Sequence, residues 1–188
     1  DIPKDILNQV AAWVEPGDLD LPGYKPTTEP NPKMVQQASS LIKKSKKPIL
    51  YVGGGIIHSK ANSELFELAT KFNIPVVTTL MGRGAFPDGH ELCLEMPGMH
   101  GNYTATTSIQ NADLLIAIGV RFDDRVTANP SFFAQNAKVI HADIDPAEIG
   151  KVRDAQVPIV GDAKLALKTL SKACSGFKAS YEWMSFAQ

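Results

Sequence analysis

Short runs of apolar residues alternate along the chain with segments in which apolar residues recur every three or four positions. The runs span residues 48–52, 74–79, 114–119, 138–142 and 157–160. Each has the length of a β-strand that is buried in a sheet. The amphipathic segments predict helices over 31–44, 63–69, 104–110 and 163–172, with a short helical piece near 130–134. This alternation predicts an α/β fold with a doubly wound, mostly parallel, Rossmann-like sheet and helices on both faces.

Residues 1–32 differ in composition from the rest, because they hold six of the thirteen prolines. Proline at this density forbids regular helix and favours extended or linker structure. We interpret 1–32 as an extended Pro-rich interdomain arm, 33–174 as the folded domain and 175–188 as the start of a C-terminal linker. Apolar residues of the arm indicate packing on another surface: Trp13, Val14, Leu19, Leu21 and Tyr24. Since the chain begins at Asp1 rather than Met, we expect a piece of a longer polypeptide.

The composition limits the classes of partner. With 188 residues, 44% of them hydrophobic, the chain can build one packed domain. Its net charge is −1 and it has no basic tract, which disfavours a nucleic-acid partner. No apolar run approaches the roughly 20 residues of a membrane span. Two separated cysteines and four scattered histidines predict a reduced, cytoplasmic protein without a metal site.

Residues suited to ligand binding follow every predicted strand. They are Gly53 to Gly55, the segment 78–82, the charged segment 121–125, Asp143, and Gly161 with Asp162. The carboxyl ends of parallel strands meet at one edge of the sheet, where open α/β sheets bind their ligands. Glycines let a ligand approach the backbone, arginine matches phosphate, and a carboxylate accepts from ribose hydroxyls. The sequence therefore predicts a nucleotide-binding edge.

Each of these signals also has a purely structural explanation. The glycine triplet does not fit G-x-G-x-x-G, because His58 stands in the last glycine position, and it could be a bare turn. The four charges of 121–125 could pair with one another on a solvated loop. Asp143 could cap the turn at Pro146, and His100 could be a structural loop histidine.

The long loop 80–101 raises a further choice. Loops of this length inside a compact domain are usually functional. Its methionines, Met81, Met96 and Met99, could fill the core or could contact a flat aromatic ligand. No nucleophile elbow, Cys–His arrangement or acid pair is recognisable, so we predict no catalytic residue in this chain. A binding module fits the sequence better than a self-sufficient enzyme.

Four sequence strings resemble one known family. They are G-M-H-G at 98–101, G-V-R-F-D-D-R-V-T at 119–127, H-A-D-I-D-P-A-E-I-G at 141–150 and G-D-A at 161–163. Together they closely resemble the central domain of the acetohydroxyacid synthase (acetolactate synthase) catalytic subunit, over about residues 1–170. The resemblance implies a three-domain enzyme that depends on thiamine diphosphate and magnesium. It joins pyruvate to a second 2-oxo acid for branched-chain amino-acid biosynthesis.

The resemblance also implies a role for this part of the enzyme. The central domain binds FAD, which serves structure rather than net redox chemistry. The catalytic glutamate belongs to the N-terminal domain, and the thiamine diphosphate and magnesium site to the C-terminal domain, so this chain alone should be inactive. The implied partners are those two domains, further copies of the subunit and a regulatory small subunit.

Individual site residues follow from matching the family strings. The residues expected to contact FAD are Gly53, Gly54, Gly55, Thr79, Leu80, Met81, Met99, His100, Gly119, Val120, Arg121, Asp123, Arg125, Val126, Asp143, Ile144, Gly161 and Asp162. Asp124 and Arg125 are expected near the substrate channel. The chain departs from the family at Ala128, where glycine is usual, and at 102–104.

Two other functions are compatible with the residues. The domain could be a non-catalytic spacer and subunit-interaction module of a thiamine-diphosphate enzyme, with a vestigial nucleotide site. It could also be a free-standing NAD-binding domain, which the missing third glycine disfavours.

Overall fold

One parallel sheet forms the centre of the protein. The computed structural model describes residues 2–17 and 22–187. Its five strands lie in the order β2-β1-β3-β4-β5 and all pair in parallel. They are β1 (Pro48–Val52), β2 (Val76–Thr78), β3 (Leu114–Ile118), β4 (Lys138–Asp143) and β5 (Val157–Val160). Every residue of β1 and β3 is buried, as expected for strands that are covered on both faces.

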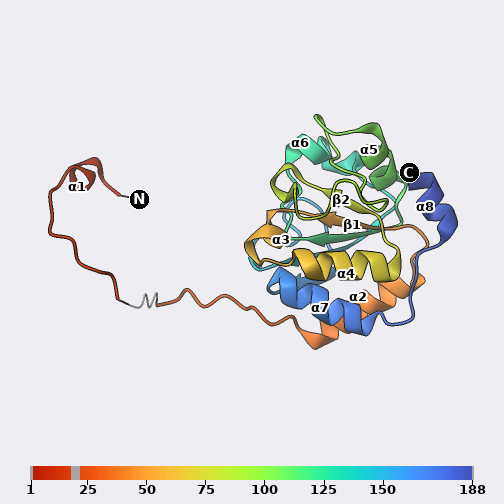
Figure 1. Cartoon of the computed structure of the whole chain (residues 1–188), viewed down its shortest axis with the longest axis horizontal. Helices are drawn as coiled ribbons and strands as arrows, with labels where there is room; N and C mark the ends of the chain where they lie inside the picture. The colour runs from red at the N-terminus through yellow and green to blue at the C-terminus, as the bar shows by residue number, and fades with distance from the viewer. Residues whose placement is uncertain (1, 18–21, 188) are drawn as a thin grey trace.

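Helices cover both faces of this sheet, which confirms the predicted α/β fold (Figure 1). One face carries α2 (Pro32–Lys44), α4 (Asn62–Phe72) and α7 (Ala163–Ala173), and the other carries α5 (Tyr103–Asn111) and α6 (Asp124–Thr127). Asn31 caps α2 by accepting a hydrogen bond from the Lys33 amide at 2.9 Å. No helix within the described residues has both the length and the apolar character needed to cross a membrane.

Several short elements were not predicted. They are α1 (Lys4–Leu7), α3 (Gly54–His58), η1 (Leu80–Gly82), α6 and α8 (Tyr181–Ala187), whereas the predicted piece near 130–134 is η2 (Pro130–Phe132). The expectation that proline forbids helix in the arm is wrong at α1, because the nearest proline precedes the turn rather than interrupting it. The glycine triplet is likewise no bare turn, since α3 begins within it.

The long loop 80–101 covers one edge of the sheet. The Val76 amide donates to the Leu92 carbonyl at 2.8 Å, and the Leu94 amide donates to the Val76 carbonyl at 2.9 Å. The Thr78 amide donates to the Glu95 carbonyl at 2.8 Å. These bonds satisfy backbone groups of the edge strand β2 that would otherwise be open to pairing with another chain.

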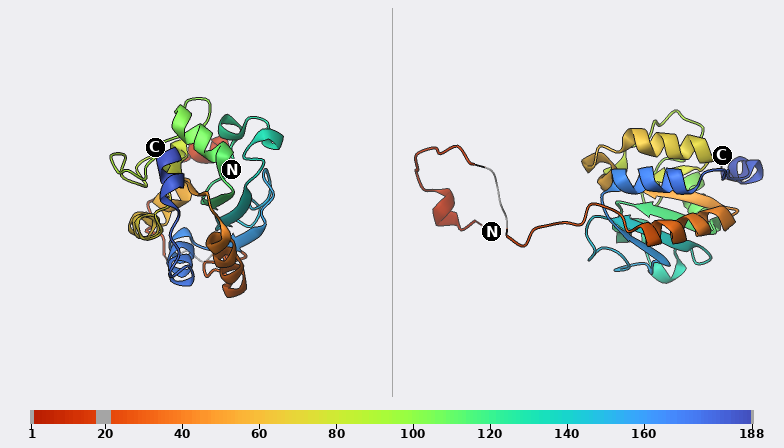
Figure 2. Two further views of the ribbon diagram at one scale, coloured as in Figure 1. Left: turned by 90° about the vertical axis from the view of Figure 1, so that its right-hand side faces the viewer. Right: turned by 90° about the horizontal axis from the view of Figure 1, so that it is seen from below.

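The two ends of the chain attach at opposite ends of the strands (Figure 2). On the incoming side, the Asp162 amide donates to the Thr28 carbonyl at 2.8 Å, beside the carboxyl end of β5. On the outgoing side, Trp183 of α8 is buried and its Nε1 donates to the carbonyl of Pro48, the first residue of β1. In the arm itself, Trp13 and Tyr24 are exposed, and Leu19 and Leu21 lie outside the described residues.

The ends of β1 and β3 are held together through glycine. The Gly53 amide donates to the Ile118 carbonyl at 3.1 Å, and the Gly55 amide donates to the Gly119 carbonyl at 3.2 Å. A Cβ added to Gly55 would lie 2.6 Å from the Gly119 Cα, closer than packed side chains allow. Gly119 also has a φ of +61°, a conformation that glycine adopts without strain.

Three glycine-to-alanine substitutions distinguish the cost of a steric clash from the cost of a strained backbone conformation. Gly55→Ala introduces only the clash, and we expect it to lower the free energy of unfolding by about 1–3 kcal/mol. Gly84→Ala introduces only strain, because Gly84 has a φ of +84° and open space around its Cα. Gly119→Ala introduces both and should be the most destabilising of the three in urea unfolding. If Gly55→Ala had the same free energy of unfolding as the wild type, the close approach of Gly55 to Gly119 would be refuted.

Candidate functional site

A cleft opens at the carboxyl edge of the sheet. Its volume is about 980 Å³. It lies where β1 and β3 are neighbours and where the connections that follow them leave toward opposite faces, which is the topological switch point of such sheets. Cofactor sites typically occupy about 300–1,000 Å³, so the cleft has room for a large ligand.

Most of the predicted site residues line this cleft. They are Gly54, Gly55, Thr79, Leu80, Met81, Gly119, Val120, Arg121, Asp123, Arg125, Val126, Asp143, Ile144 and Asp162. They come from the ends of all five strands, although the positions are spread over more than 100 residues of sequence. The convergence follows from the parallel topology, which turns every strand's carboxyl end to the same edge.

Two predicted glycines, Gly53 and Gly161, are not part of the cleft lining. A Cβ on Gly53 would approach the Gly119 carbonyl oxygen to 2.2 Å. A Cβ on Gly161 would meet the Thr28 carbonyl oxygen at 3.0 Å. Gly53 therefore needs glycine for packing within the chain whether or not a ligand is bound, and Gly161 packs tightly against the backbone of the arm.

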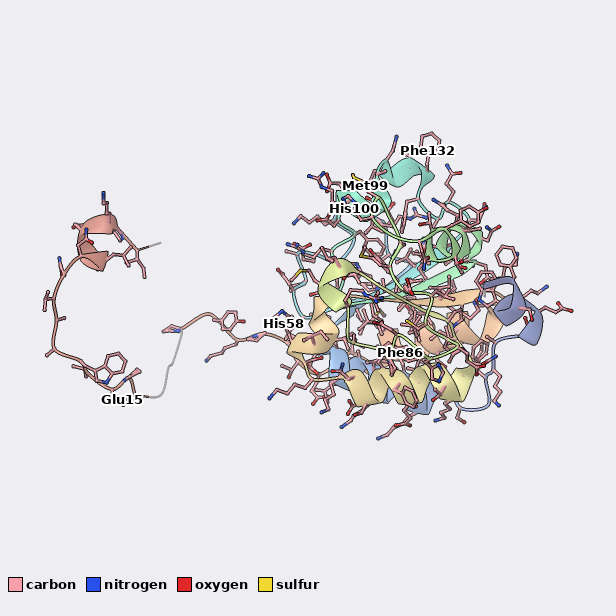
Figure 3. The ribbon with its side chains drawn as sticks, turned by 45° about the horizontal axis from the view of Figure 1, so that its top comes forward. Glu15, His58, Phe86, Met99, His100 and Phe132 are labelled. Carbon is pink, nitrogen blue, oxygen red and sulfur yellow. The ribbon has the colours of Figure 1, made fainter. Side chains whose placement is uncertain are left out.

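Met99, His100 and Asp124 also lie outside the cleft lining. Figure 3 shows Met99 and His100 beside each other on their loop, well apart from His58 on α3. The Met99 amide donates to the Arg125 carbonyl at 3.0 Å, so this loop adjoins the charged segment without facing the cleft. Their roles stay predictions.

Six lining residues were not among the predicted site residues: His58, Ser59, Phe122, Asp145, Glu148 and Ala163. Asp145 and Glu148 follow the end of β4 closely, so the rule that ligands meet strand ends could have found them. His58 and Ser59 lie at the end of α3, a helix that was not predicted because its first residues are glycines.

The charged segment after β3 is only partly paired within itself. Asp123 caps α6 by accepting from the Arg125 amide at 3.0 Å, and this hydrogen bond lowers the pKa of Asp123. Arg125 lies 3.6 Å from Asp124 in an exposed ion pair of little strength. Arg121 makes no ion pair within the described part of the chain. The self-paired alternative is thus confirmed for one pair, and Arg121 stays available to a ligand.

Acidic side chains gather at the other end of the cleft. Asp143 accepts a hydrogen bond from the Asp145 amide at 2.9 Å, so the turn-capping explanation is confirmed, while the same residue also lines the cleft. Burial raises the pKa of Asp143. Asp162 caps α7 by accepting from the Lys164 amide at 2.9 Å and the Leu165 amide at 3.1 Å. The cleft therefore has arginines at β3 and carboxylates at β4 and β5.

Methionine side chains stand at the surface near the cleft. Met81 is 70% exposed and Met99 is 65% exposed. The alternative that these methionines fill the core is therefore wrong for both. Leu80, next to Met81 in the cleft lining, is also mostly exposed. The rim of the cleft near η1 thus presents apolar side chains without a partner in the described chain.

Comparison with known proteins identifies the family. Residues 35–170 match the family described as thiamine pyrophosphate enzyme, central domain. This chain belongs to that family. Within that family, the chain resembles acetolactate synthases, as the sequence strings predicted. The chain is 53% identical over 185 residues to the acetolactate synthase large subunit of Corynebacterium glutamicum, and the match covers 98% of this chain and 30% of that relative.

Relatives in other organisms have the same description. The central domain is 57% identical over 170 residues to the acetolactate synthase large subunit IlvB1 of Mycobacterium tuberculosis, covering 90% of this chain and 28% of the relative. It is 49% identical over 176 residues to a probable acetolactate synthase large subunit of Methanocaldococcus jannaschii, covering 92% and 30%. The chain therefore spans under a third of the length of these relatives.

The two departures from the family pattern have local consequences in this central domain. Ala128 has φ +50° and ψ −114°, a backbone conformation in which glycine is less strained than alanine. Asn102 caps α5, because its side chain accepts a hydrogen bond from the Ala105 amide at 2.7 Å. Tyr103, the first residue of α5, is almost fully exposed.

The buried His141 makes the stability of the central domain dependent on pH. Burial lowers the pKa of His141, although its hydrogen bond to the Val120 carbonyl and the carboxylates of Asp143 and Glu148 oppose this effect. Just below the ordinary histidine pKa of about 6.5, His141 therefore binds a proton in the unfolded chain but not in the folded protein. Stability should fall as the pH drops through this value and should be fully present above it.

Urea unfolding between pH 5 and 7.5 tests this dependence. The control is His141→Gln, which keeps an N–H donor but cannot titrate. We expect the wild type to lose stability more steeply than the variant, by at most about 1.4 kcal/mol per pH unit for one proton. The raised pKa of Asp143 acts in the opposite sense, since it removes stability as the pH rises from about 4, and Asp143 is present in both proteins. Identical slopes would contradict the prediction.

Proposed function

We propose that this chain is the FAD-binding middle domain of an acetolactate synthase large subunit. One observation carries the proposal: the ends of five strands bring glycines, arginines and carboxylates together in a single cleft of about 980 Å³ at the switch point of the sheet. That set of groups matches a nucleotide, and the relatives are acetolactate synthases.

The residues of the cleft fit the chemistry of FAD. Gly54 and Gly55 line the cleft without side chains, so a ligand can approach the backbone there. Arg121 and Arg125 can hold the diphosphate, because guanidinium groups match phosphate oxygens. Asp143 and Asp162 can accept hydrogen bonds from the ribose hydroxyls at the adenosine end. Leu80 and Met81 offer apolar surface to the flat ring system.

In the parent enzyme this domain would be one of three. The reaction would decarboxylate pyruvate on thiamine diphosphate and join the two-carbon unit to a second 2-oxo acid, in branched-chain amino-acid biosynthesis in the cytoplasm. Thiamine diphosphate and magnesium would bind outside this chain. Further copies of the subunit and a regulatory small subunit would complete the assembly, and Asp124 with Arg125 would lie near the substrate channel.

Titration with FAD, followed by quenching of flavin fluorescence, tests the cofactor. We expect saturable binding by the wild type. Arg121→Ala should weaken it by about tenfold or more, the range of a lost charge-assisted hydrogen bond. Arg83→Ala is the matched control, because Arg83 pairs with Asp88 at 2.9 Å outside the cleft and its loss should leave the affinity unchanged. No binding at millimolar FAD would instead support a spacer and subunit-interaction module.

The isolated chain should form no acetolactate. We expect no product from pyruvate even with FAD, thiamine diphosphate and Mg²⁺ added, because the groups that activate thiamine belong to other domains of the parent. Colorimetric assay of acetolactate checks this, with a complete acetolactate synthase as the positive control. Measurable turnover by the purified chain would refute the assignment as a middle domain.

A further inference from the structure

Four aromatic rings are packed under the loop that follows β3. Tyr51, Phe122, Phe133 and His141 form this aromatic cluster, and each is at most 3% exposed. Phe122 touches the other three, with ring centroids 5.5 Å from Tyr51, 6.2 Å from Phe133 and 5.1 Å from His141. All of these contacts are edge-on, the geometry that aromatic pairs favour. Of the four, only Phe122 also lines the cleft.

Phe122 anchors the loop in an unusual backbone conformation. Its φ is +53°, in the left-handed region that bulky residues rarely adopt. Such strain persists only where surrounding contacts enforce it, and here the buried ring supplies those contacts. The residues on either side, Arg121 and Asp123, are exposed and line the cleft. Because the Phe122 ring points into the core, Arg121 and Asp123 face the cleft.

His141 holds the loop from below by two contacts. Its Nε2 lies 2.9 Å from the Val120 carbonyl oxygen, immediately before the charged segment. A carbonyl only accepts hydrogen bonds, so Nε2 carries the proton and donates. The ring also packs edge-on against Phe122 at an interplanar angle of 85°. Nδ1 is buried and has no hydrogen-bond partner among the described residues, so the hydrogen bond through Nε2 is the one that orients this side chain.

We infer that His141 is a positioning residue of the flavin site. Its hydrogen bond to Val120 and its ring contact with Phe122 fix the loop so that Arg121 and Asp123 face the cleft. The flavin part of this inference rests on the proposed function. Without the Nε2 donor, the Val120 carbonyl is buried and unpaired, and it must rotate to find another donor. That rotation moves the adjoining Arg121 away from the diphosphate position.

The alternative is that His141 only stabilises the core. Phe133→Leu is the matched control, because Phe133 is also buried in the aromatic cluster but its side chain has no group that could hydrogen-bond to the loop backbone. A purely structural role predicts that His141→Phe and Phe133→Leu weaken FAD binding equally when their thermal stabilities match. A positioning role predicts that only His141→Phe weakens it.

The decisive measurements compare these variants with His141→Gln, which restores an N–H donor near the Nε2 position. We expect His141→Phe to raise the Kd for FAD by about tenfold or more and to change the visible circular dichroism of the bound flavin. His141→Gln should stay within about threefold of the wild type and Phe133→Leu should be unchanged. Equal affinity of His141→Phe and the wild type, or no rescue by His141→Gln, would overturn the inference.

Amide hydrogen exchange of residues 119–125 without FAD tests the ordering of the loop independently of the cofactor. We expect faster exchange in His141→Phe than in Phe133→Leu and in His141→Gln. Unchanged exchange in His141→Phe would refute the positioning role even if FAD binds. Faster exchange in a chain that does not bind FAD at all would refute the proposed function and the flavin role, while it would establish that His141 orders the loop.

Discussion

The approach of β1 to β3 at their carboxyl ends determines where the cleft forms. Gly55 and Gly119 let the two backbones touch, with an amide-to-carbonyl hydrogen bond of 3.2 Å that a side chain on either residue would obstruct. The glycine triplet therefore continues directly into α3, and the loop after β3 begins at a left-handed residue. Because the chain turns to opposite faces after these two strands, the space between the connections stays open for a ligand.

The loop after β3 combines a rigid interior with a polar exterior. Phe122 and the buried His141 fix its backbone, whereas Arg121 and Asp123 face solvent in the cleft. Burial raises the pKa of the Tyr51 hydroxyl, with a further contribution from Asp123, and burial lowers the pKa of His141. Both side chains are therefore uncharged near neutral pH, so the aromatic cluster beneath the loop carries no charge.

Charge is distributed along the cleft in a way that suits an elongated anionic ligand with a sugar at one end. Arg121 lacks an ion pair within the described residues, and the pair between Arg125 and Asp124 is exposed and weak. The carboxylates at β4 and β5 accept backbone hydrogen bonds and keep further lone pairs for hydroxyl donors. The apolar rim at η1 adds surface that the flat ring system of the proposed cofactor could contact.

The order of strands and helices could be read from the sequence, because apolar runs and helical periodicity are local properties of the chain. Matching the family strings named 18 expected contact residues, and 14 of them line the cleft, where parallel topology brings the strand ends together. What the sequence could not reveal depends on contacts between distant residues. Only the tertiary structure placed Gly53 and Gly161 in backbone packing, kept Met99 and His100 out of the cleft, and set His141 beneath Val120. Glycine, methionine and histidine are compatible with both core and ligand positions, so their roles depend on which neighbours the fold supplies.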